Sequence, residues 1–286
     1  MWDDYVKNVF ALIFGSDRFN PMVEVLKFNP ATEIPNAWTG VQAVYNNLMV
    51  PIALGLMVIW FLVKFMEKST MEQITLEQVF MLFVKLLAAK FLIDNGLEIF
   101  TKLWSLGISL IDETINSISD KKSASIYIFN ADGTPSPELQ ELWKTFTGKD
   151  WSEELGFLDS IVINFQLMLP SLATFILIGC VYFIGYTRLM EMLVRICGAP
   201  IALSDFMTEG LRGAGWRYLK NFLAVCLQGM LIIVIIRLHN QVLYDVMTNP
   251  SGEWYTIMLM QLGVSFSAVA LMFKSLSLCK ELVGTA

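Results

Sequence analysis

The sequence predicts an all-α fold: a polytopic membrane helical bundle of about five transmembrane helices, with an amphipathic N-terminal helix and a small extracytoplasmic segment. Of its 286 residues, 55% are hydrophobic and 16% are charged, which leaves too little polar surface for a soluble domain. The stretch 160–187 holds no charged residue and no histidine. Because about 20 apolar residues cross a bilayer core, this stretch is expected to span a membrane.

Three more uncharged apolar stretches, at 41–63, 221–236 and 254–273, predict further spans. The first and second transmembrane helices are therefore expected within 41–115 and the last two within 221–273. Pro51 lies inside the first span, where the missing N–H removes a helical hydrogen bond and tends to bend the helix.

Residues 1–40 are predicted to form an amphipathic N-terminal region. Its first 15 residues carry apolar side chains at helical spacing: Trp2, Tyr5, Val6, Val9, Phe10 and Ile13. We expect a helix that ends near Gly15. It can lie in the headgroup plane, pack on a partner, or cover the protein's own spans. The stretch lacks the basic head and cleavage site of a secretory leader.

The region 76–115 leaves the number of spans open. It contains two apolar runs, 79–93 and 97–111, separated by the turn signal Asp94-Asn95-Gly96. One straight helix of about 36 residues would be roughly 54 Å long and would overshoot the bilayer. Either one span continues into a helix outside the core, giving five spans, or two short spans form a hairpin, giving six. Five is favoured.

Basic residues near span ends stay on the cytoplasmic side and so orient the chain. The connection 188–220 carries five Lys/Arg and the tail 274–286 carries Lys274 and Lys280, so both are expected inside. The segment 116–159 has eight Asp/Glu against four Lys and is expected to be an extracytoplasmic loop.

Within that loop, local patterns predict three features. Residues 126–129 resemble a short strand, and apolar residues at helical spacing after Pro137 predict a helix. Asp150 and Glu153 have the spacing of a capping box for the next helix.

No catalytic, cofactor or metal site is expected. The four cysteines lack the spacing of a zinc site or a disulfide framework. His239 is the only histidine, which excludes sites that need two, and it is expected at a membrane edge beside Arg237. No phosphate-binding loop with its lysine occurs either.

Polar residues inside the apolar runs are the first candidate functional positions. Lys85 and Lys90 are costly in a bilayer, so each must pair, reach the interface or line a wet cavity. Lys90 is expected to reach Asp94, which leaves Lys85 as the better functional candidate. Each of three spans carries one amide, and these are expected to bond between helices rather than line a substrate path: Gln166, Gln228 and Gln261.

The basic connection supplies the other candidates. Arg188, Glu191 and Arg195 are spaced i, i+3 and i+7, which predicts a small ion network on one helical face. Pro200, after Ala199, is expected to interrupt a helix near the inner face. Arg195 and Arg212 are expected to dock a partner.

The order of these features resembles a known family. The phrases that carry the likeness are Asn46-Asn47-Leu48-Met49-Val50-Pro51-Ile52-Ala53, Asp94-Asn95-Gly96, Arg195-Ile196-Cys197-Gly198-Ala199-Pro200-Ile201-Ala202 and Gly215-Trp216-Arg217-Tyr218-Leu219-Lys220. Over roughly residues 40–275 the chain resembles the TrbL-like polytopic inner-membrane subunits of conjugative type IV secretion systems, particularly those of Gram-positive integrative conjugative elements.

The resemblance implies a non-catalytic channel or scaffold subunit of the cytoplasmic membrane that passes DNA with bound protein. The implied partners are other membrane subunits, cytoplasmic ATPases and the lipid bilayer, and the subunit is expected to be oligomeric. A net charge of -6 offers no basic track for phosphates, so contact with DNA is expected only as transient passage. The competing class is a solute transporter or ion channel, motivated by Lys85 and the intramembrane glutamines.

Overall fold

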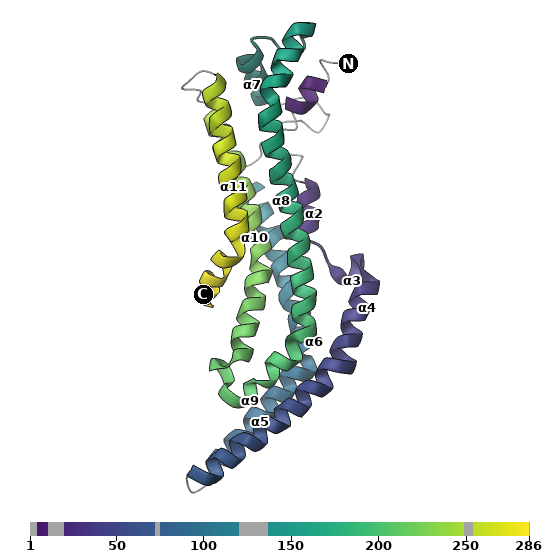
Figure 1. The fold of residues 1–286 in the computed structure, drawn as a ribbon, viewed down its shortest axis with the longest axis vertical. Helices are drawn as coiled ribbons and strands as arrows, with labels where there is room; N and C mark the ends of the chain where they lie inside the picture. Colours follow the sequence, from purple (N-terminus) through teal and green to yellow (C-terminus); the bar gives the residue numbers. More distant parts are fainter. Residues whose placement is uncertain (1–4, 11–19, 72–74, 120–136, 249–253, 286) are drawn as a thin grey trace. The chain divides into compact units, whose positions relative to one another are not determined.

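The computed structural model describes residues 5–10, 20–71, 75–119, 137–248 and 254–285, and every regular element in these ranges is helical (Figure 1). Residues 5–10 form one helical segment. The elements that follow are α2 (Asn20–Leu26), α3 (Pro30–Glu33), α4 (Pro35–Val44), the π-helical turn η2 (Tyr45–Met49), α5 (Val50–Met71), α6 (Leu76–Ser119), α7 (Pro137–Thr147), α8 (Phe157–Ser204), α9 (Phe206–Glu209), the 3-10 turn η3 (Gly210–Arg212), α10 (Ala214–Thr248) and α11 (Trp254–Val283).

The prediction of an all-α membrane bundle is confirmed. Four stretches in the described residues are long and apolar enough to cross a membrane: Pro35–Ser69, Phe157–Thr208, Ala214–Leu243 and Met258–Val283. They include the uncharged runs at 41–63, 160–187 and 221–236 and most of 254–273. The apolar run of α6 is not among the four, since it contains Lys85 and Lys90 and is flanked by Glu77 and Asp94.

Helix α6 decides between the two alternatives for this region. It runs for 44 residues without a break, so the hairpin at Asp94-Asn95-Gly96 is wrong, and with it the six-span alternative. The side chains of Asp94 and Asn95, which predicted a turn, instead form hydrogen bonds with residues one turn earlier on α6. Asp94 pairs with Lys90 at 2.5 Å, and the Asn95 amide donates to the Phe91 carbonyl at 2.9 Å. Gly96 leaves room for the Tyr45 hydroxyl, which donates to the Ile93 carbonyl at 2.9 Å.

The chain divides into two compact units. The first contains Met1–Lys27, Ile111–Gly185 and Met230–Ser275, and the second contains Phe28–Leu110, Tyr186–Gly229 and Leu276–Ala286. Helices α6, α8, α10 and α11 contribute segments to both. Each unit has an apolar core of its own.

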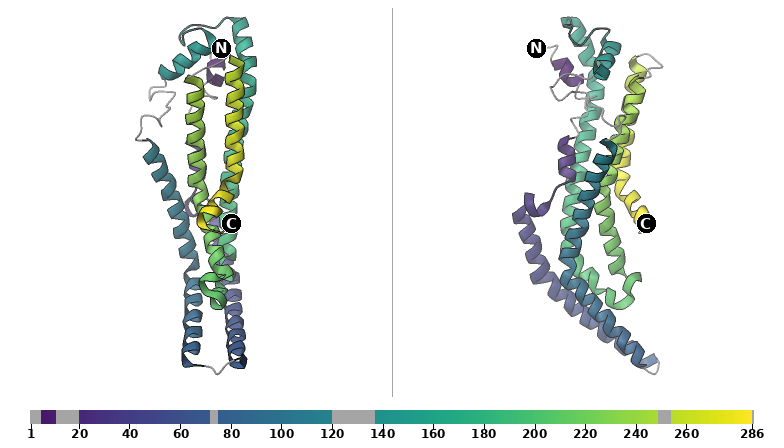
Figure 2. Two further views of the ribbon diagram at one scale, coloured as in Figure 1. Left: turned by 90° about the vertical axis from the view of Figure 1, so that its left-hand side faces the viewer. Right: turned by 180° about the vertical axis from the view of Figure 1, so that it is seen from behind.

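In the second unit, α5 and α6 lie side by side and antiparallel (Figure 2). The rings of Phe61 and Phe83 meet at 5.4 Å between them. The core joins these helices to α8 and α10 through buried residues such as Met57, Ile93 and Ile196. The first span, Pro35–Ser69, contains the π-helical turn η2, which ends at Met49, two residues before Pro51. Because Pro51 has no N–H to donate, the helical ladder is already irregular at this point.

In the first unit, the N-terminal helical segment packs on the protein itself, which selects one of the three alternatives. Val6 and Phe10 are fully buried, and the Phe10 ring meets Trp143 of α7 edge-on at 5.2 Å. The Lys7 ammonium lies 5.9 Å from the Trp151 ring centre. Tyr5, counted on the apolar face, is 53% exposed.

The segment between α6 and α8 confirms one local prediction and corrects another. The helix after Pro137 is present as α7, whereas the expected strand at 126–129 lies outside the described residues. The capping box is wrong, because α8 begins only at Phe157. The Asp150 carboxylate instead pairs with Lys144 at 2.9 Å, and this hydrogen bond raises the pKa of Lys144 because it favours the charged ammonium.

Candidate functional site

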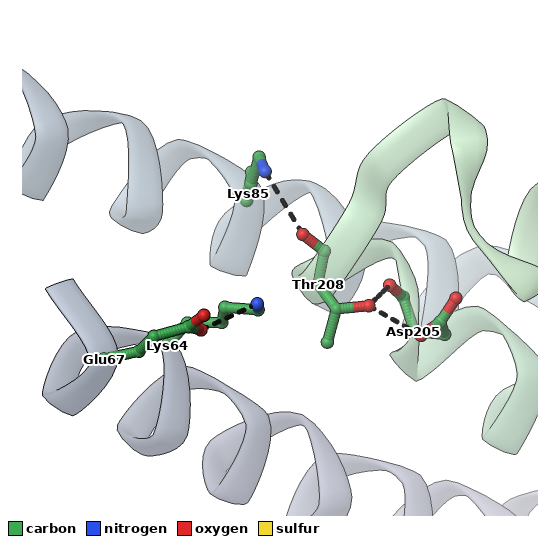
Figure 3. Close-up of polar contacts among 5 residues, drawn as sticks. All are labelled: Lys64, Glu67, Lys85, Asp205 and Thr208. Carbon is green, nitrogen blue, oxygen red and sulfur yellow. Dashed lines mark hydrogen bonds and ion pairs between the residues drawn. The ribbon is translucent and has the colours of Figure 1, made fainter.

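The connection between α8 and α10 forms a polar corner in the second unit, which we call the α9 corner (residues 205–213). Figure 3 shows its main side chains, Asp205 and Thr208, with Lys85 of α6 and the Lys64–Glu67 pair of α5 nearby. Helix α8 ends at Ser204 and α10 begins at Ala214. Gly210 has φ +61° and ψ −128°, a conformation that side chains with a Cβ rarely adopt, so it permits the reversal.

Asp205 holds this corner together. Its Oδ2 accepts hydrogen bonds from the Ala214 N–H at 2.6 Å and the Gly215 N–H at 3.4 Å. These are the first two N–H groups of α10, which have no partner within the helix, so Asp205 acts as a cap from nine residues away. Its Oδ1 accepts from the Thr208 hydroxyl at 2.6 Å. A carboxylate at the N-terminus of α10 also complements the helix dipole.

Lys85 ties α6 to the same corner. Its ammonium donates to the Thr208 carbonyl at 3.3 Å, and its side chain is half-buried among the apolar residues of α6. On α5, Lys64 and Glu67 pair with each other at 2.8 Å. The Lys85 ammonium therefore has a hydrogen-bond acceptor in the α9 corner. A lysine in an apolar run needs such a polar partner.

Replacing Asp205 with alanine is expected to cost about 1–2 kcal/mol of unfolding free energy, because the α10 cap is lost. Amide hydrogen exchange at Ala214 and Gly215 should accelerate, since Asp205 accepts from both N–H groups. Thr208→Val is the matched control, because it removes the hydroxyl bond and keeps the cap. Unchanged exchange at both amides in Asp205→Ala would contradict the capping role.

Arg188 departs from the predicted ion network. Its side chain is 2% exposed, and its Nε and Nη2 donate to the backbone carbonyls of Val225 and Cys226 at 2.8 and 2.9 Å. Its guanidinium also lies 4.2 Å from the ring centre of Trp104. Arg188 of α8 thus binds α10 and stacks on α6, and its role is to hold three helices together within the second unit.

The other two members of the predicted network do pair. Arg195 contacts Glu191 at 2.6 Å, one turn apart on α8. The Tyr218 hydroxyl of α10 donates to the Arg195 carbonyl at 2.5 Å, and the Arg195 guanidinium lies 6.0 Å from the Tyr218 ring. Both charged side chains remain partly exposed, at 20% and 27%, so this pair lies at the edge of the packed core.

Pro200 does not interrupt its helix, which corrects another expectation. Helix α8 continues through Pro200 to Ser204, because Ile196, Ala199 and Leu203 are buried in the core and hold the helix on both sides. Neighbouring groups can compensate for a proline inside a membrane helix. The break occurs at the α9 corner instead, where Arg212 is exposed.

Among the intramembrane amides, Gln261 differs from expectation. Gln166 is half-buried, and Gln261 is 1% exposed with no hydrogen-bond partner at either amide atom, so the expected interhelical bond of Gln261 is not formed. His239 is 4% exposed and contacts Ser265 of α11, so it is buried between helices. Lys90 pairs with Asp94 as predicted.

Sequence reasoning did not select three residues that organise the site. Asp205 and Thr208 look like ordinary loop residues, and Trp104 looks like one more aromatic residue in an apolar run. The indole of Trp104 donates to the Phe28 carbonyl at 3.2 Å. No local pattern marks Asp205 as a cap, because it lies nine residues before the first residue of α10.

The chemistry of this cluster is binding and positioning. All four cysteines are free. Across the described ranges, no three His, Cys, Asp or Glu side chains gather as metal ligands. The charged groups reach backbone carbonyls, backbone N–H groups and one another.

These features define a class: a multi-pass, all-α membrane protein whose polar groups organise helix packing. A family model described as TrbL/VirB6 plasmid conjugal transfer like protein matches residues 20–200, and the chain therefore belongs to this family. The match contains Lys85, Arg188 and Pro200 and ends before the α9 corner. Comparisons with curated proteins and with solved structures gave no match.

Proposed function

We propose that this protein is a non-catalytic channel or scaffold subunit of a conjugative type IV secretion complex in the cytoplasmic membrane. Its role is to support the transfer of DNA with bound protein. The observation that carries the proposal is the family match over residues 20–200, which covers the helices from α2 to most of α8. In this proposal, other molecules supply the cargo, the remaining membrane subunits and the energy for transfer.

The orientation follows from charge. We count α6 as a fifth span beside the four apolar stretches, and in the proposed topology the N-terminus lies outside and the α9 corner inside. Uninterrupted α6 supports this count. In this orientation Arg212, Lys85 and the Lys64–Glu67 pair lie near the cytoplasmic face.

The α9 corner is then a docking surface for a cytoplasmic ATPase of the same system. Its exposed Arg212 extends from a segment fixed by Asp205 and Gly210, so a partner meets a preformed surface. A preformed surface lowers the ordering cost of binding. Binding is expected to be salt-sensitive, because rim charges act mainly through long-range attraction.

Two experiments test these proposals separately. Deleting the gene from a donor cell should reduce DNA transfer to the level of a donor without mating machinery, and the intact gene in trans should restore it. Transfer that continues at the original frequency would contradict the proposed function. Substrate-dependent flux through the purified protein in liposomes would favour a transporter instead.

For docking, a photo-crosslinking residue at Arg212 should capture the ATPase in intact cells. The matched control is the same residue at Glu141 of α7, which is exposed and lies in the segment proposed to be outside. Capture of the ATPase from Glu141, or from neither position, would overturn the docking surface and the orientation behind it while leaving the role in transfer untouched.

A further inference from the structure

A buried polar contact joins α10 and α11 within the first unit. His239 of α10 is 4% exposed, and its Nε2 lies 3.3 Å from the hydroxyl of Ser265, which is 2% exposed on α11. Its Nδ1 lies 3.2 Å from the side-chain oxygen of Asn240. Both helices belong to stretches apolar enough to span a membrane, where polar contacts of this kind are costly unless they are satisfied.

The partners of the ring determine its tautomer. The Asn240 oxygen faces Nδ1 and can only accept a hydrogen bond, so this contact favours the tautomer protonated at Nδ1. In this tautomer Nε2 is an acceptor, and the Ser265 hydroxyl donates to it. Neutral His239 is therefore hydrogen-bonded at both nitrogens.

Gln261 adds a second polar group to this face. It lies one turn before Ser265 on α11, at i and i+4, so both side chains are neighbours on one side of the helix. Gln261 is 1% exposed, and neither its amide oxygen nor its amide nitrogen has a partner. An unsatisfied buried amide is costly, and its oxygen is a ready acceptor for a hydroxyl that turns toward it.

The charged surroundings are sparse. Between Trp254 and Phe273, α11 carries no charged residue, and between Ser160 and Gly185, α8 carries none; their titratable side chains there are Tyr255, Cys180 and Tyr182. On α10, Arg237 is half-buried and Asp245 is exposed. Further charges on segments of the first unit are Asp112 and Glu113 of α6, Glu24 of α2 and Lys27 directly after α2, where Lys27 pairs with Asp112. The side chains that contact the two ring nitrogens, Asn240 and Ser265, are both neutral.

We propose that His239, Ser265 and Gln261 form a proton-binding site inside the α10–α11 pair. A proton from water binds the lone pair of Nε2, and the new N–H donates to the Ser265 oxygen. The Ser265 hydroxyl turns away from the ring and donates to the Gln261 oxygen. The site then changes the direction of its hydrogen bonds across the two helices, His239 and Ser265 stay hydrogen-bonded in both states, and the Gln261 oxygen gains a donor in the protonated state.

The single histidine makes the test direct, because a histidine-labelled chain gives one imidazole signal. The full chain, labelled with nitrogen-15 in histidine and placed in phosphatidylcholine bilayers, is studied by solid-state NMR between about pH 8 and pH 4. At neutral pH we expect a protonated Nδ1 and a hydrogen-bonded, unprotonated Nε2. On acidification both nitrogens should become protonated. A protonated Nε2 at neutral pH, or a ring that stays neutral over the whole range, would overturn the proposal.

Two variants identify the relay. Ser265→Ala should move the neutral ring toward the tautomer protonated at Nε2. Gln261→Leu should leave the neutral spectrum unchanged but lower the ratio of protonated to neutral imidazole at a fixed acidic pH about tenfold, because the protonated state loses an acceptor. Gln166→Leu, a matched amide on α8, should change neither signal. An unchanged ratio in Gln261→Leu would show that Gln261 is not part of the site. The contact between His239 and Ser265 is tested by the tautomer of the wild-type ring, which needs no variant.

Discussion

Replacing Arg188 with alanine is expected to lower the unfolding free energy by about 2–4 kcal/mol, the largest effect among the charged residues discussed. The variant loses two charge-assisted hydrogen bonds to α10 carbonyls and the stacking on Trp104. It also leaves a cavity in a closely packed core. The variant no longer has to bury a charged side chain, and this gain offsets part of the loss, so the net cost stays at about 2–4 kcal/mol. Unfolding of the purified chain in increasing SDS measures it, and DNA transfer should fall in parallel.

Arg188→Met separates packing from hydrogen bonding, because methionine fills much of the volume and keeps the apolar contact with Trp104 without a charge. The loss of unfolding free energy in Arg188→Met should be roughly half the loss in Arg188→Ala. Arg212→Ala is the control, since Arg212 is exposed at the α9 corner. Equal stability of Arg188→Ala and Arg212→Ala would show that Arg188 does not hold the three helices together.

Replacing Gly107 with alanine is expected to destabilise the second unit although alanine is the better helix former. A Cβ at this position would lie 2.7 Å from the Cys226 carbonyl oxygen and 3.1 Å from the Cys226 Cβ. A backbone oxygen cannot rotate away, so α6 and α10 must separate. Overpacking of this kind costs about 1–3 kcal/mol, which exceeds the gain of about 0.5–1 kcal/mol from helix propensity. The same SDS titration measures the difference.

Gly55→Ala is the matched control, because nothing lies within 4 Å of a Cβ there and Gly55 is exposed on α5. It should be neutral or slightly stabilising. If Gly107→Ala and Gly55→Ala behaved alike, the close approach of α6 to α10 would not be a determinant of stability. The Cys226 carbonyl oxygen that limits the space at Gly107 also accepts a hydrogen bond from Nη2 of Arg188.

Much of the fold was predictable because the bilayer acts on each segment separately. An uncharged run such as 160–187 enters lipid whatever its neighbours do, and helical hydrogen bonding is then obligatory. Helix α7 was predictable for a different reason, since it is amphipathic and its spacing shows which face is apolar. The pair formed by Lys90 and Asp94 followed from local geometry alone.

The site was less predictable, because apolar membrane helices do not reveal which face is buried. On α8, Phe165 is 79% exposed and Leu167 is fully buried, although both are equally apolar. Packing also overrode local sequence signals. Gly96 predicted a turn and Pro200 predicted a helix break, but both lie inside continuous helices. Arg188 was placed on a charged face by its spacing, whereas it is buried between helices.

The sequence by itself determined that this is a helical, multi-pass membrane protein, the apolar runs that cross the membrane, and the likeness to its conjugal-transfer family. Those properties depend on local composition. Only the tertiary structure decided the continuity of α6, the partners of Arg188, the capping of α10 by Asp205 and the burial of His239 beside Ser265. Each of these depends on a contact between residues distant in sequence, and in lipid, where apolar faces are interchangeable, no local pattern specifies such contacts.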